Sequence, residues 1–192
     1  MARKFMLVSC CVLVAACSSR ETTPYTVAED GYASIRNSFI SEGYGVTAPE
    51  DIPPDTAPSA TYDGYILLDA SSIWLRESYA GEMTLEAQFA SDTVTGSASN
   101  LYDSSGRAVA GSLSISGGQI DRSAAPASGG QITGGLDGVL SDADGVVLTV
   151  DSTLTGDFYG PDAEGYMAVI GGTMSSTDYG TELLQGRSIG SR

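Results

Sequence analysis

Hydrophobic and polar residues alternate along short segments between residues 60 and 176, and turn-forming residues such as Gly, Ser and Asp separate the segments. The alternation is clearest at 83–89, where Met, Leu, Ala and Phe occupy every second position. A period of two is typical of strands with one buried face. The segments indicate roughly eight strands. Because closure hides every strand edge, we expect an all-β fold, a small antiparallel soluble β-barrel.

A period near 3.6 residues precedes the strands. The apolar residues at this spacing are Ala28, Tyr32, Ile35 and Phe39. Thr26 and Glu29 have the spacing of a capping box, and Gly43 and Gly45 are stop signals, so a short N-terminal helix is predicted between them. The helix either plugs the barrel, packs on it or engages a partner, or it is a stalk helix that covers an open edge. Four prolines in 48–59 then predict a stiff, extended linker.

The first residues have the features of an export signal. Arg3 and Lys4 form a basic start, and an apolar run from 5 to 16 follows that is shorter than the roughly 20 residues of a membrane-spanning helix. Leu-Val-Ala-Ala at 13–16 stands directly before Cys17 and resembles the lipobox of bacterial lipoproteins. This resemblance implies cleavage after Ala16, a diacylglycerol thioether on Cys17 and further acylation of its amine. Several acyl chains anchor a protein stably.

The remaining cysteines and Ser18 refine this expectation. Cys10 and Cys11 belong to the signal, so the mature chain has no pair for a disulfide. Ser18, a residue other than Asp after the lipidated cysteine, resembles the sorting pattern of the outer membrane. We therefore expect a lipid anchor in that membrane. The predicted organisation is a signal peptide at 1–16, lipidated cysteine, tether, helix and linker at 17–59, the barrel at 60–176 and a C-terminal tail at 177–192.

Charge and composition exclude several functions. The net charge is −15, and removal of Arg3 and Lys4 leaves 7 basic residues against 24 acidic ones, or −17. Such a surface repels nucleic acid, and it either keeps the domain in solution or suits a cationic partner. Without histidine, catalytic triads and histidine metal sites are impossible. Asp-Ala-Asp-Gly at 142–145 predicts a hairpin turn, because the remaining ligands of a calcium loop are missing. We expect no enzyme activity, metal or cofactor.

Two glycine-rich segments resemble the barrel domains of transferrin-binding protein B and related surface lipoproteins. Gly-Gln-Ile-Thr-Gly-Gly-Leu at 130–136 is similar to a strand of that family. The segment 156–164 resembles the stretch that joins the family's last two barrel strands, and its matching residues are Gly156, Phe158, Tyr159, Gly160, Pro161, Ala163 and Glu164. Gly160 and Pro161 suit a sharp reversal, and Phe158 and Tyr159 face opposite sides of a strand. A structural turn is favoured over a binding site.

The resemblance implies the barrel fold and surface lipidation. The family usually has one more residue between Ala163 and Glu164, and its full members have two lobes, whereas this chain has room for one barrel. Transferrin binding is therefore not implied. The expected function is that of a non-catalytic binding protein or uptake accessory. The alternative is a structural or envelope-interaction lipoprotein without a nutrient ligand.

One segment has the composition of a binding surface. Trp74, Arg76 and Tyr79 are of the residue types that dominate binding hot spots, and Trp74 is the only tryptophan. They are candidate contacts for a protein partner, and scattered tyrosines are candidates for a haem or small-molecule pocket. The alternative is a plain barrel strand in which Ile73, Leu75 and Tyr79 point inward.

Replacement of Cys17 tests the anchor. Cys17→Ser should remove the acylated thiol and move the protein from the membrane fraction to the aqueous fraction, with loss of incorporated palmitate. Cys11→Ser, within the predicted signal, is the matched control and should stay membrane-bound. Continued membrane association of Cys17→Ser would disprove lipidation at this residue.

Overall fold

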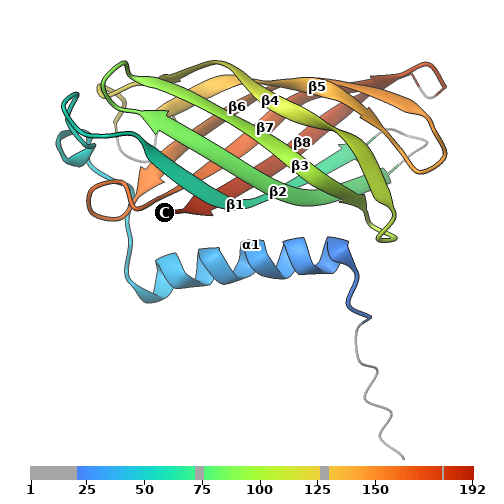
Figure 1. The fold of residues 1–192 in the computed structure, drawn as a ribbon, viewed down its shortest axis with the longest axis horizontal. Coiled ribbons are helices and arrows are strands. Elements are labelled where there is room, and N and C mark those ends of the chain that lie inside the picture. Colours follow the sequence, from blue (N-terminus) through green and yellow to red (C-terminus); the bar gives the residue numbers. More distant parts are fainter. Residues whose placement is uncertain (1–20, 72–75, 126–129, 179) are drawn as a thin grey trace, which may run out of the picture.

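Eight antiparallel strands form a closed barrel in the computed structural model, which describes residues 21–71, 76–125, 130–178 and 180–192 (Figure 1). The strands are β1 (Ala60–Ser71), β2 (Arg76–Gln88), β3 (Thr93–Asp103), β4 (Ala108–Ile120), β5 (Ile132–Ser141), β6 (Val147–Tyr159), β7 (Gly165–Ser176) and β8 (Gly180–Ser191). Each pairs with its neighbour in the chain, and β1 pairs with β8. The prediction of a small all-β barrel is confirmed.

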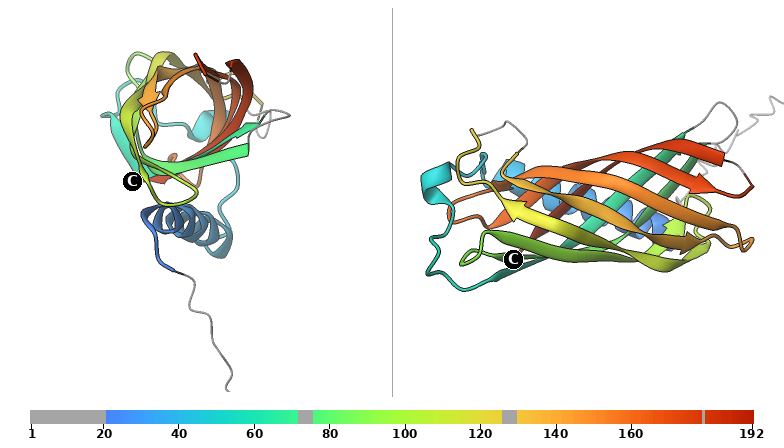
Figure 2. Two further views of the ribbon diagram at one scale, coloured as in Figure 1. Left: turned by 90° about the vertical axis from the view of Figure 1, so that its right-hand side faces the viewer. Right: turned by 90° about the horizontal axis from the view of Figure 1, so that it is seen from above.

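Alternating side chains explain the closed wall. In β6, Leu148, Val150, Ser152 and Leu154 point inward and are buried, whereas Thr149, Asp151 and Thr153 between them are exposed. The largest fully buried side chains include Tyr62, Phe89, Phe158 and Tyr166. Their ring centroids lie 5.8–6.0 Å apart in contacting pairs. The ribbon encloses an open circle in Figure 2, but aromatic and aliphatic side chains fill this lumen.

Helix α1 (Pro24–Ser41) starts earlier than predicted. Its N-cap is Thr23, whose hydroxyl accepts the Thr26 backbone N–H at 3.2 Å, while the Thr26 hydroxyl accepts the Thr23 N–H at 2.9 Å. Thr26 is thus the third helical residue of the capping box and not its cap, and Glu29 takes no part in it. The helix ends just before Gly43, as predicted. Within the described residues, no helix has the length and apolar character needed to cross a membrane.

Helix α1 lies against the outer wall of the barrel (Figure 1, Figure 2). Its buried residues Ala28, Tyr32 and Phe39 contact a second cluster that includes Leu67, Ala80 and Ile189, from β1, β2 and β8. The predicted apolar face is confirmed, and packing on the barrel is the observed alternative. The helix neither plugs the lumen nor covers an open edge, because the closed sheet has none. Gly31 permits this approach, since a Cβ there would lie 2.3 Å from the Tyr65 ring.

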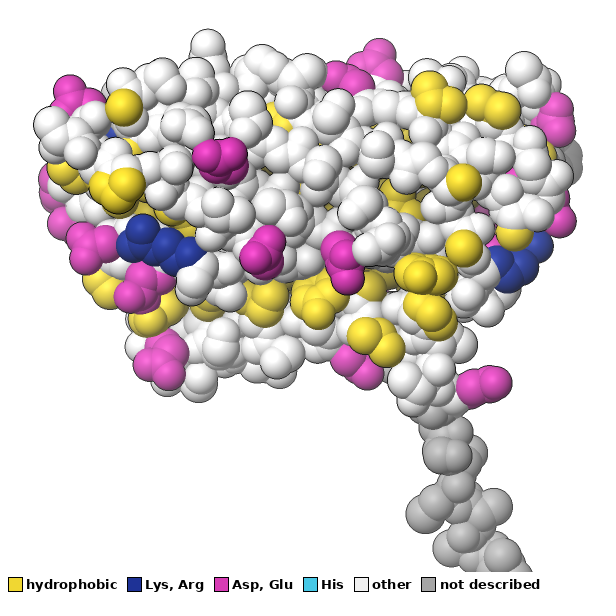
Figure 3. All heavy atoms as spheres, viewed as in Figure 1, with side chains coloured by type: hydrophobic (Ala, Val, Ile, Leu, Met, Phe, Trp, Pro, Cys, Tyr) yellow, Lys and Arg dark blue, Asp and Glu magenta, His cyan; other side chains and the backbone are white. Residues whose placement is uncertain are grey.

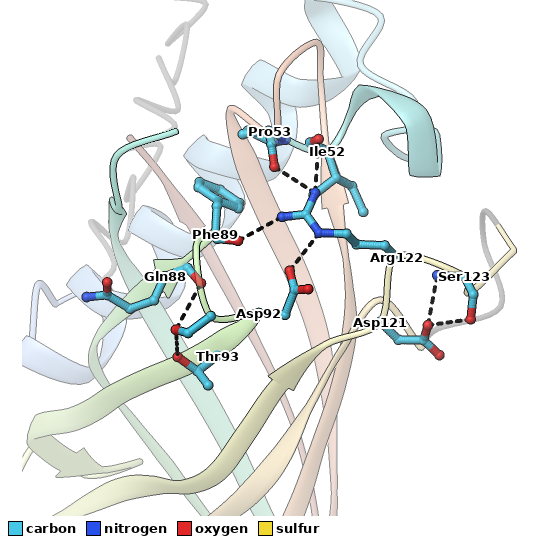
Figure 4. Close-up of polar contacts among 10 residues, drawn as sticks. Ile52, Pro53, Gln88, Phe89, Asp92, Thr93, Asp121, Arg122 and Ser123 are labelled. Atoms are coloured by element: carbon cyan, nitrogen blue, oxygen red, sulfur yellow. Dashed lines mark hydrogen bonds and ion pairs between the residues drawn. The ribbon is translucent and has the colours of Figure 1, made fainter. Parts of the chain in front are cut away.

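Residues 45–59 seal one end of the barrel and are not an extended spacer. Val46 forms a bridge with Tyr159, and a 3₁₀ turn η1 (Pro49–Asp51) precedes Ile52, which is 3% exposed and belongs to the core. Arg122 fixes the segment by donating to the carbonyl of Pro53 at 2.7 Å and to that of Ile52 at 3.3 Å (Figure 4). The prolines restrict the backbone of this segment as predicted, but the segment folds back on the barrel because Ile52 is buried in the core.

The C-terminal residues 177–192 are also different from the prediction. They were expected as a tail, but Gly180–Ser191 is strand β8 and closes the barrel. The sequence around Tyr79 belongs to β2, which continues without interruption from Arg76 to Gln88. The predicted number of strands is therefore right, although the eighth lies beyond the predicted limit of the barrel.

Truncation of one lumen side chain tests the filled core. Leu136→Ala in β5 should lower the free energy of unfolding by about 2–5 kcal/mol, because Leu136 is completely buried and the change leaves a cavity. Val139→Ala, in the same strand, should change it by less than about 1 kcal/mol, since Val139 is 55% exposed. Urea denaturation measures both. Equal losses would contradict the assignment of inward and outward positions.

Candidate binding site at the hairpin end of the barrel

The two ends of the barrel differ in what covers them. The ends of β1, β3, β5 and β7 and the starts of β2, β4, β6 and β8 lie at one end of the barrel, named here the hairpin end (Figure 1). The opposite ends of the strands and residues 45–59 lie at the other end, named the linker end. Because strand order fixes this division, every candidate residue can be assigned to one end.

The segment 156–164 lies at the linker end and forms a structural turn. Phe158 is buried in the lumen, and Tyr159 lies outside, where its ring stacks on Phe39 at 6.0 Å. Gly160 has a φ of +82°, which favours glycine, and the buried Tyr62 hydroxyl donates to the Ala163 carbonyl at 2.7 Å. Burial raises the pKa of Tyr62 to about 12. The turn joins β6 to β7, the sixth and seventh strands, and not the last two.

Gln131 connects the two segments that resemble transferrin-binding protein B. It is fully buried; its side chain donates to the Thr47 carbonyl at 2.7 Å and accepts the Phe158 backbone N–H at 3.0 Å. The Thr47 hydroxyl in turn donates to the Gly160 carbonyl at 2.7 Å. This buried network locks the linker to the ends of β5 and β6. Sequence analysis missed it, because its three parts are far apart in the chain.

A single arginine completes the closure of the linker end. Arg122 donates from Nε to Asp92 Oδ1 at 2.6 Å and from Nη2 to the Phe89 carbonyl at 3.0 Å, in addition to its bonds to the linker (Figure 4). One guanidinium thus satisfies three carbonyls and one carboxylate. These four bonds join the linker, the β2–β3 turn and the end of β4 at this end of the barrel.

The predicted partner-binding residues divide between the described and undescribed parts of the chain. Trp74 lies outside the described residues, between the end of β1 and the start of β2. Arg76 is the first residue of β2, at the hairpin end. Tyr79 is 4% exposed and belongs to the lumen core. The alternative of an inward strand residue is therefore confirmed for Tyr79, and its ring lies just inside the hairpin end.

Carboxylates gather at this same end. Glu77 and Asp103 lie on lumen-facing positions of β2 and β3, and the turn between β5 and β6 adds Asp142 and Asp144. Together with Tyr79 they line a cavity of about 70 Å³. Close spacing of like charges in a partly enclosed space raises the energy of the ionised forms. The arrangement attracts positive charge.

Arg107 compensates part of this charge. Its Nε donates to Asp103 Oδ2 at 2.6 Å, and its Nη1 donates to Asp144 Oδ2 at 3.0 Å. Burial acts to raise the pKa of Asp103, but the backbone and side-chain hydrogen bonds from Arg107 outweigh it, and the pKa is lowered. Asp142 Oδ1 accepts the Asp144 and Val146 backbone N–H groups and shapes the predicted hairpin. Three of the carboxylates thus have local partners.

Glu77 and Glu182 are less well compensated. Burial, followed by the charge of Asp103, raises the pKa of Glu77. Glu182, at the start of β8, is 7% exposed, and its Oε1 has no hydrogen-bond partner. Burial and the nearby charges of Glu77 and Asp142 raise the pKa of Tyr79. Among the side chains that the structure describes, none forms an ion pair with Glu77 or Glu182.

The arrangement does not resemble a metal centre. In the ranges that the structure describes, no three Asp, Glu, Cys or His side chains are placed to hold a metal ion. Calcium needs six to eight oxygen ligands at 2.3–2.6 Å in one shell. Here the carboxylates come from separate strands and a turn, and they line the walls of the opening.

A groove along α1 is a second surface feature. Two adjoining clefts of about 480 and 500 Å³ follow the junction of α1 with β1, β2 and β3, and both are lined by Tyr65 and Glu82. Hydrophobic side chains form a row along this junction in Figure 3. Asn100 donates to Glu82 at 2.6 Å in one wall. The groove combines apolar and acidic groups and is open to solvent.

Fold and site together define a class of protein: a closed eight-stranded antiparallel barrel with a filled lumen, an external helix and an acidic opening. Comparison with protein-family models and with curated proteins finds no match for this chain. The resemblance to transferrin-binding protein B barrels, expected from residues 130–136 and 156–164, therefore stays a prediction.

Replacement of Glu77 by Gln tests whether the ionised carboxylate destabilises the folded barrel. Glu77→Gln should raise the free energy of unfolding at pH 7 by up to about 1 kcal/mol, because ionised Glu77 is disfavoured in the folded state. The pKa of Glu77 is raised in the folded state. The gain in stability of Glu77→Gln over wild type should therefore shrink as the pH falls through that raised pKa. It should vanish below the ordinary value of 4.5, where Glu77 is protonated in both states.

Urea denaturation at pH 7 and pH 4 measures this difference. The matched control is Glu50→Gln, since Glu50 is exposed at the linker end and should show no such trend. If Glu77→Gln gained the same stability at both pH values, the ionised carboxylate would not be the cause of the destabilisation.

Proposed function

We propose that this protein is a non-catalytic binding lipoprotein of the outer membrane, anchored through Cys17, which engages its partner at the hairpin end of the barrel. The observation that supports this site is the carboxylate of Glu77, which lines a small cavity with Asp103 and Tyr79 and forms no ion pair with a described side chain. At the linker end, by contrast, the guanidinium of Arg122 is paired with Asp92 and bonded to main-chain carbonyls. Uncompensated charge at one opening is typical of a surface that meets a partner.

The position of α1 also supports the proposal that the partner binds at the hairpin end. The turn between β3 and β4 lies against the start of the helix, since a Cβ at Gly106 would be 2.9 Å from the Thr23 Cβ. Five residues lie between Cys17 and Thr23, which makes six steps from one Cα to the next. Fully extended, they span at most about 20 Å. An anchor on Cys17 would hold the hairpin end within that distance of the bilayer, where a membrane-embedded partner can reach it.

Side chains fill the lumen, so we infer that a ligand binds at the surface of the barrel. Ligand pockets for haem-sized molecules are clefts of about 300–1,000 Å³. Tyr62 and Tyr166 are both fully buried, and the Tyr62 hydroxyl is bonded to a main-chain carbonyl. These tyrosines are part of the packed core. A partner that contacts the rim of the barrel is therefore favoured over a small molecule within it.

Site-specific cross-linking in cells tests this proposal. A photoreactive residue in place of Ser105, exposed in the β3–β4 turn, should give a discrete cross-linked product with a membrane protein. The same residue in place of Ser123, exposed near the linker end, should not. Adding Cys17→Ser to the position-105 variant should abolish the product, because the anchor holds the hairpin end at the membrane.

The position-123 variant is the matched control, since both sites are exposed serines in loops. Products from both positions alike, from 123 alone or from neither would contradict a binding function at the hairpin end. The first of these outcomes would favour the alternative of a structural envelope lipoprotein.

A further inference from the structure

The groove along α1 consists of two clefts that follow the helix on the side of β2 and β3. In the first cleft, of about 480 Å³, the middle of the helix faces β1 and β2. In the second, of about 500 Å³, the first turns of the helix face β2 and β3. Tyr65 and Glu82 line both clefts, so the two clefts meet at these residues.

The groove has the length of a short extended peptide. Its helical wall runs from Pro24 to Ile35. At a rise of 1.5 Å per residue, these residues cover about 17 Å of the helix axis. An extended chain advances about 3.3 Å per residue, so about five residues of a ligand chain span the groove. The groove is therefore longer than a single side chain requires.

Apolar surface on both walls of the groove is open to solvent. Val27, on the helical wall of the second cleft, is 50% exposed, and Ile35 in the first cleft is only half-buried. Tyr65 and Tyr102 belong to the opposite wall and are also half-buried. Contact with apolar side chains of a ligand would remove this surface from water, which is favourable.

Two carboxylates add negative charge to the barrel wall of the groove. Glu82 and Asp63 are both exposed. Each accepts one hydrogen bond from a neutral side chain, Glu82 from Asn100 at 2.6 Å and Asp63 from Thr84 at 3.1 Å. Neither carboxylate forms an ion pair with a described side chain, and neither cleft has arginine or lysine among the described residues that line it.

This charge selects the kind of occupant. Arg187 lies on β8, on the other side of β1 from the groove, with its guanidinium 5.1 Å from the centroid of the Tyr32 ring. Positive charge thus flanks the helix away from the groove. A second copy of this chain, with a net charge of −15, and an anionic lipid surface would both be repelled by the carboxylates. A basic segment of another protein complements them.

We propose that the groove binds an extended segment of a partner protein in which a Lys or Arg side chain lies between apolar ones. The basic side chain pairs with Glu82, where the two clefts meet, and the apolar ones pack on Val27 and Ile35. This inference rests on the proposed function. The second cleft includes Thr23, beside Gly106 of the β3–β4 turn, so a partner at the hairpin end reaches the groove directly.

Site-specific cross-linking of the full chain in cells tests the groove. A photoreactive residue in place of Ser34, which lines the first cleft, should give a discrete product with a protein partner. Asn37 is the matched control, because it is exposed on the same helix and lines neither cleft; it should give at least fivefold less of that product. Mass spectrometry of the digested product should place the cross-link within about five residues of a Lys or Arg of the partner.

Charge reversal tests the assigned ion pair. Added to the position-34 variant, Glu82→Lys should lower the yield of the product at least fivefold, and Glu82→Gln should lower it less. Glu50→Lys at the linker end makes the same change in net charge and should leave the yield within twofold. Thermal unfolding of the purified variants checks that each is folded, as expected for changes at exposed positions.

Five results would overturn the proposal. These are no product from position 34, equal product from positions 34 and 37, a product with a second copy of this chain or with lipid, a partner segment without Lys or Arg, and no greater loss from Glu82→Lys than from Glu50→Lys. If position 105 gives its product and position 34 gives none, the groove assignment is wrong and binding at the hairpin end stands. A product from position 34 without one from position 105 gives the opposite assignment.

Discussion

The pairing of β1 with β8 is the constraint on which the rest of the structure depends. Nine residue pairs, from Asp63 with Ser191 to Ser71 with Leu183, join the first strand to the last. Without them two strand edges would be open to other chains. Helix α1 lies over this seam, since Leu67 and Ile189 beneath it come from the two closing strands. The same closure brings Glu182, near the C-terminus, within electrostatic reach of Glu77.

Local patterns were enough to predict most of the barrel and α1. Residues 83–89 alternate cleanly, and residues 142–145 have the turn chemistry of a tight hairpin, so both were found. Strand β8 was missed because its inward positions include Gly186 and Ser188, whereas its exposed positions include Leu183. With serine at an inward position and leucine at an outward one, the hydrophobic residues of this segment do not alternate with polar ones. Only pairing with both neighbouring strands makes this segment a strand, and that information is not local.

The candidate site could not be predicted for a related reason. Glu77, Asp103 and Glu182 are separated by 26 and 79 residues, and each looks like an ordinary surface acid in its own segment. Their meeting depends on register, since a shift of one residue in β8 would turn Glu182 outward. The hot-spot composition selected Arg76 and Tyr79, which lie at this end of β2, and the ring of Tyr79 is both part of the core cluster and part of the cavity lining. It gave no sign of the carboxylates.

The two ends of the barrel show how stability and binding are separated in one small domain. At the linker end, the neutral hydrogen bonds of Gln131 and the four bonds of Arg122 hold the linker against the barrel. Burial of apolar side chains in the lumen stabilises the fold, and this stabilisation offsets the unfavourable electrostatic energy at the hairpin end. At the hairpin end, repulsion among the carboxylates is already present in the free protein. Neutralisation of these carboxylates would relieve that repulsion and stabilise the folded state.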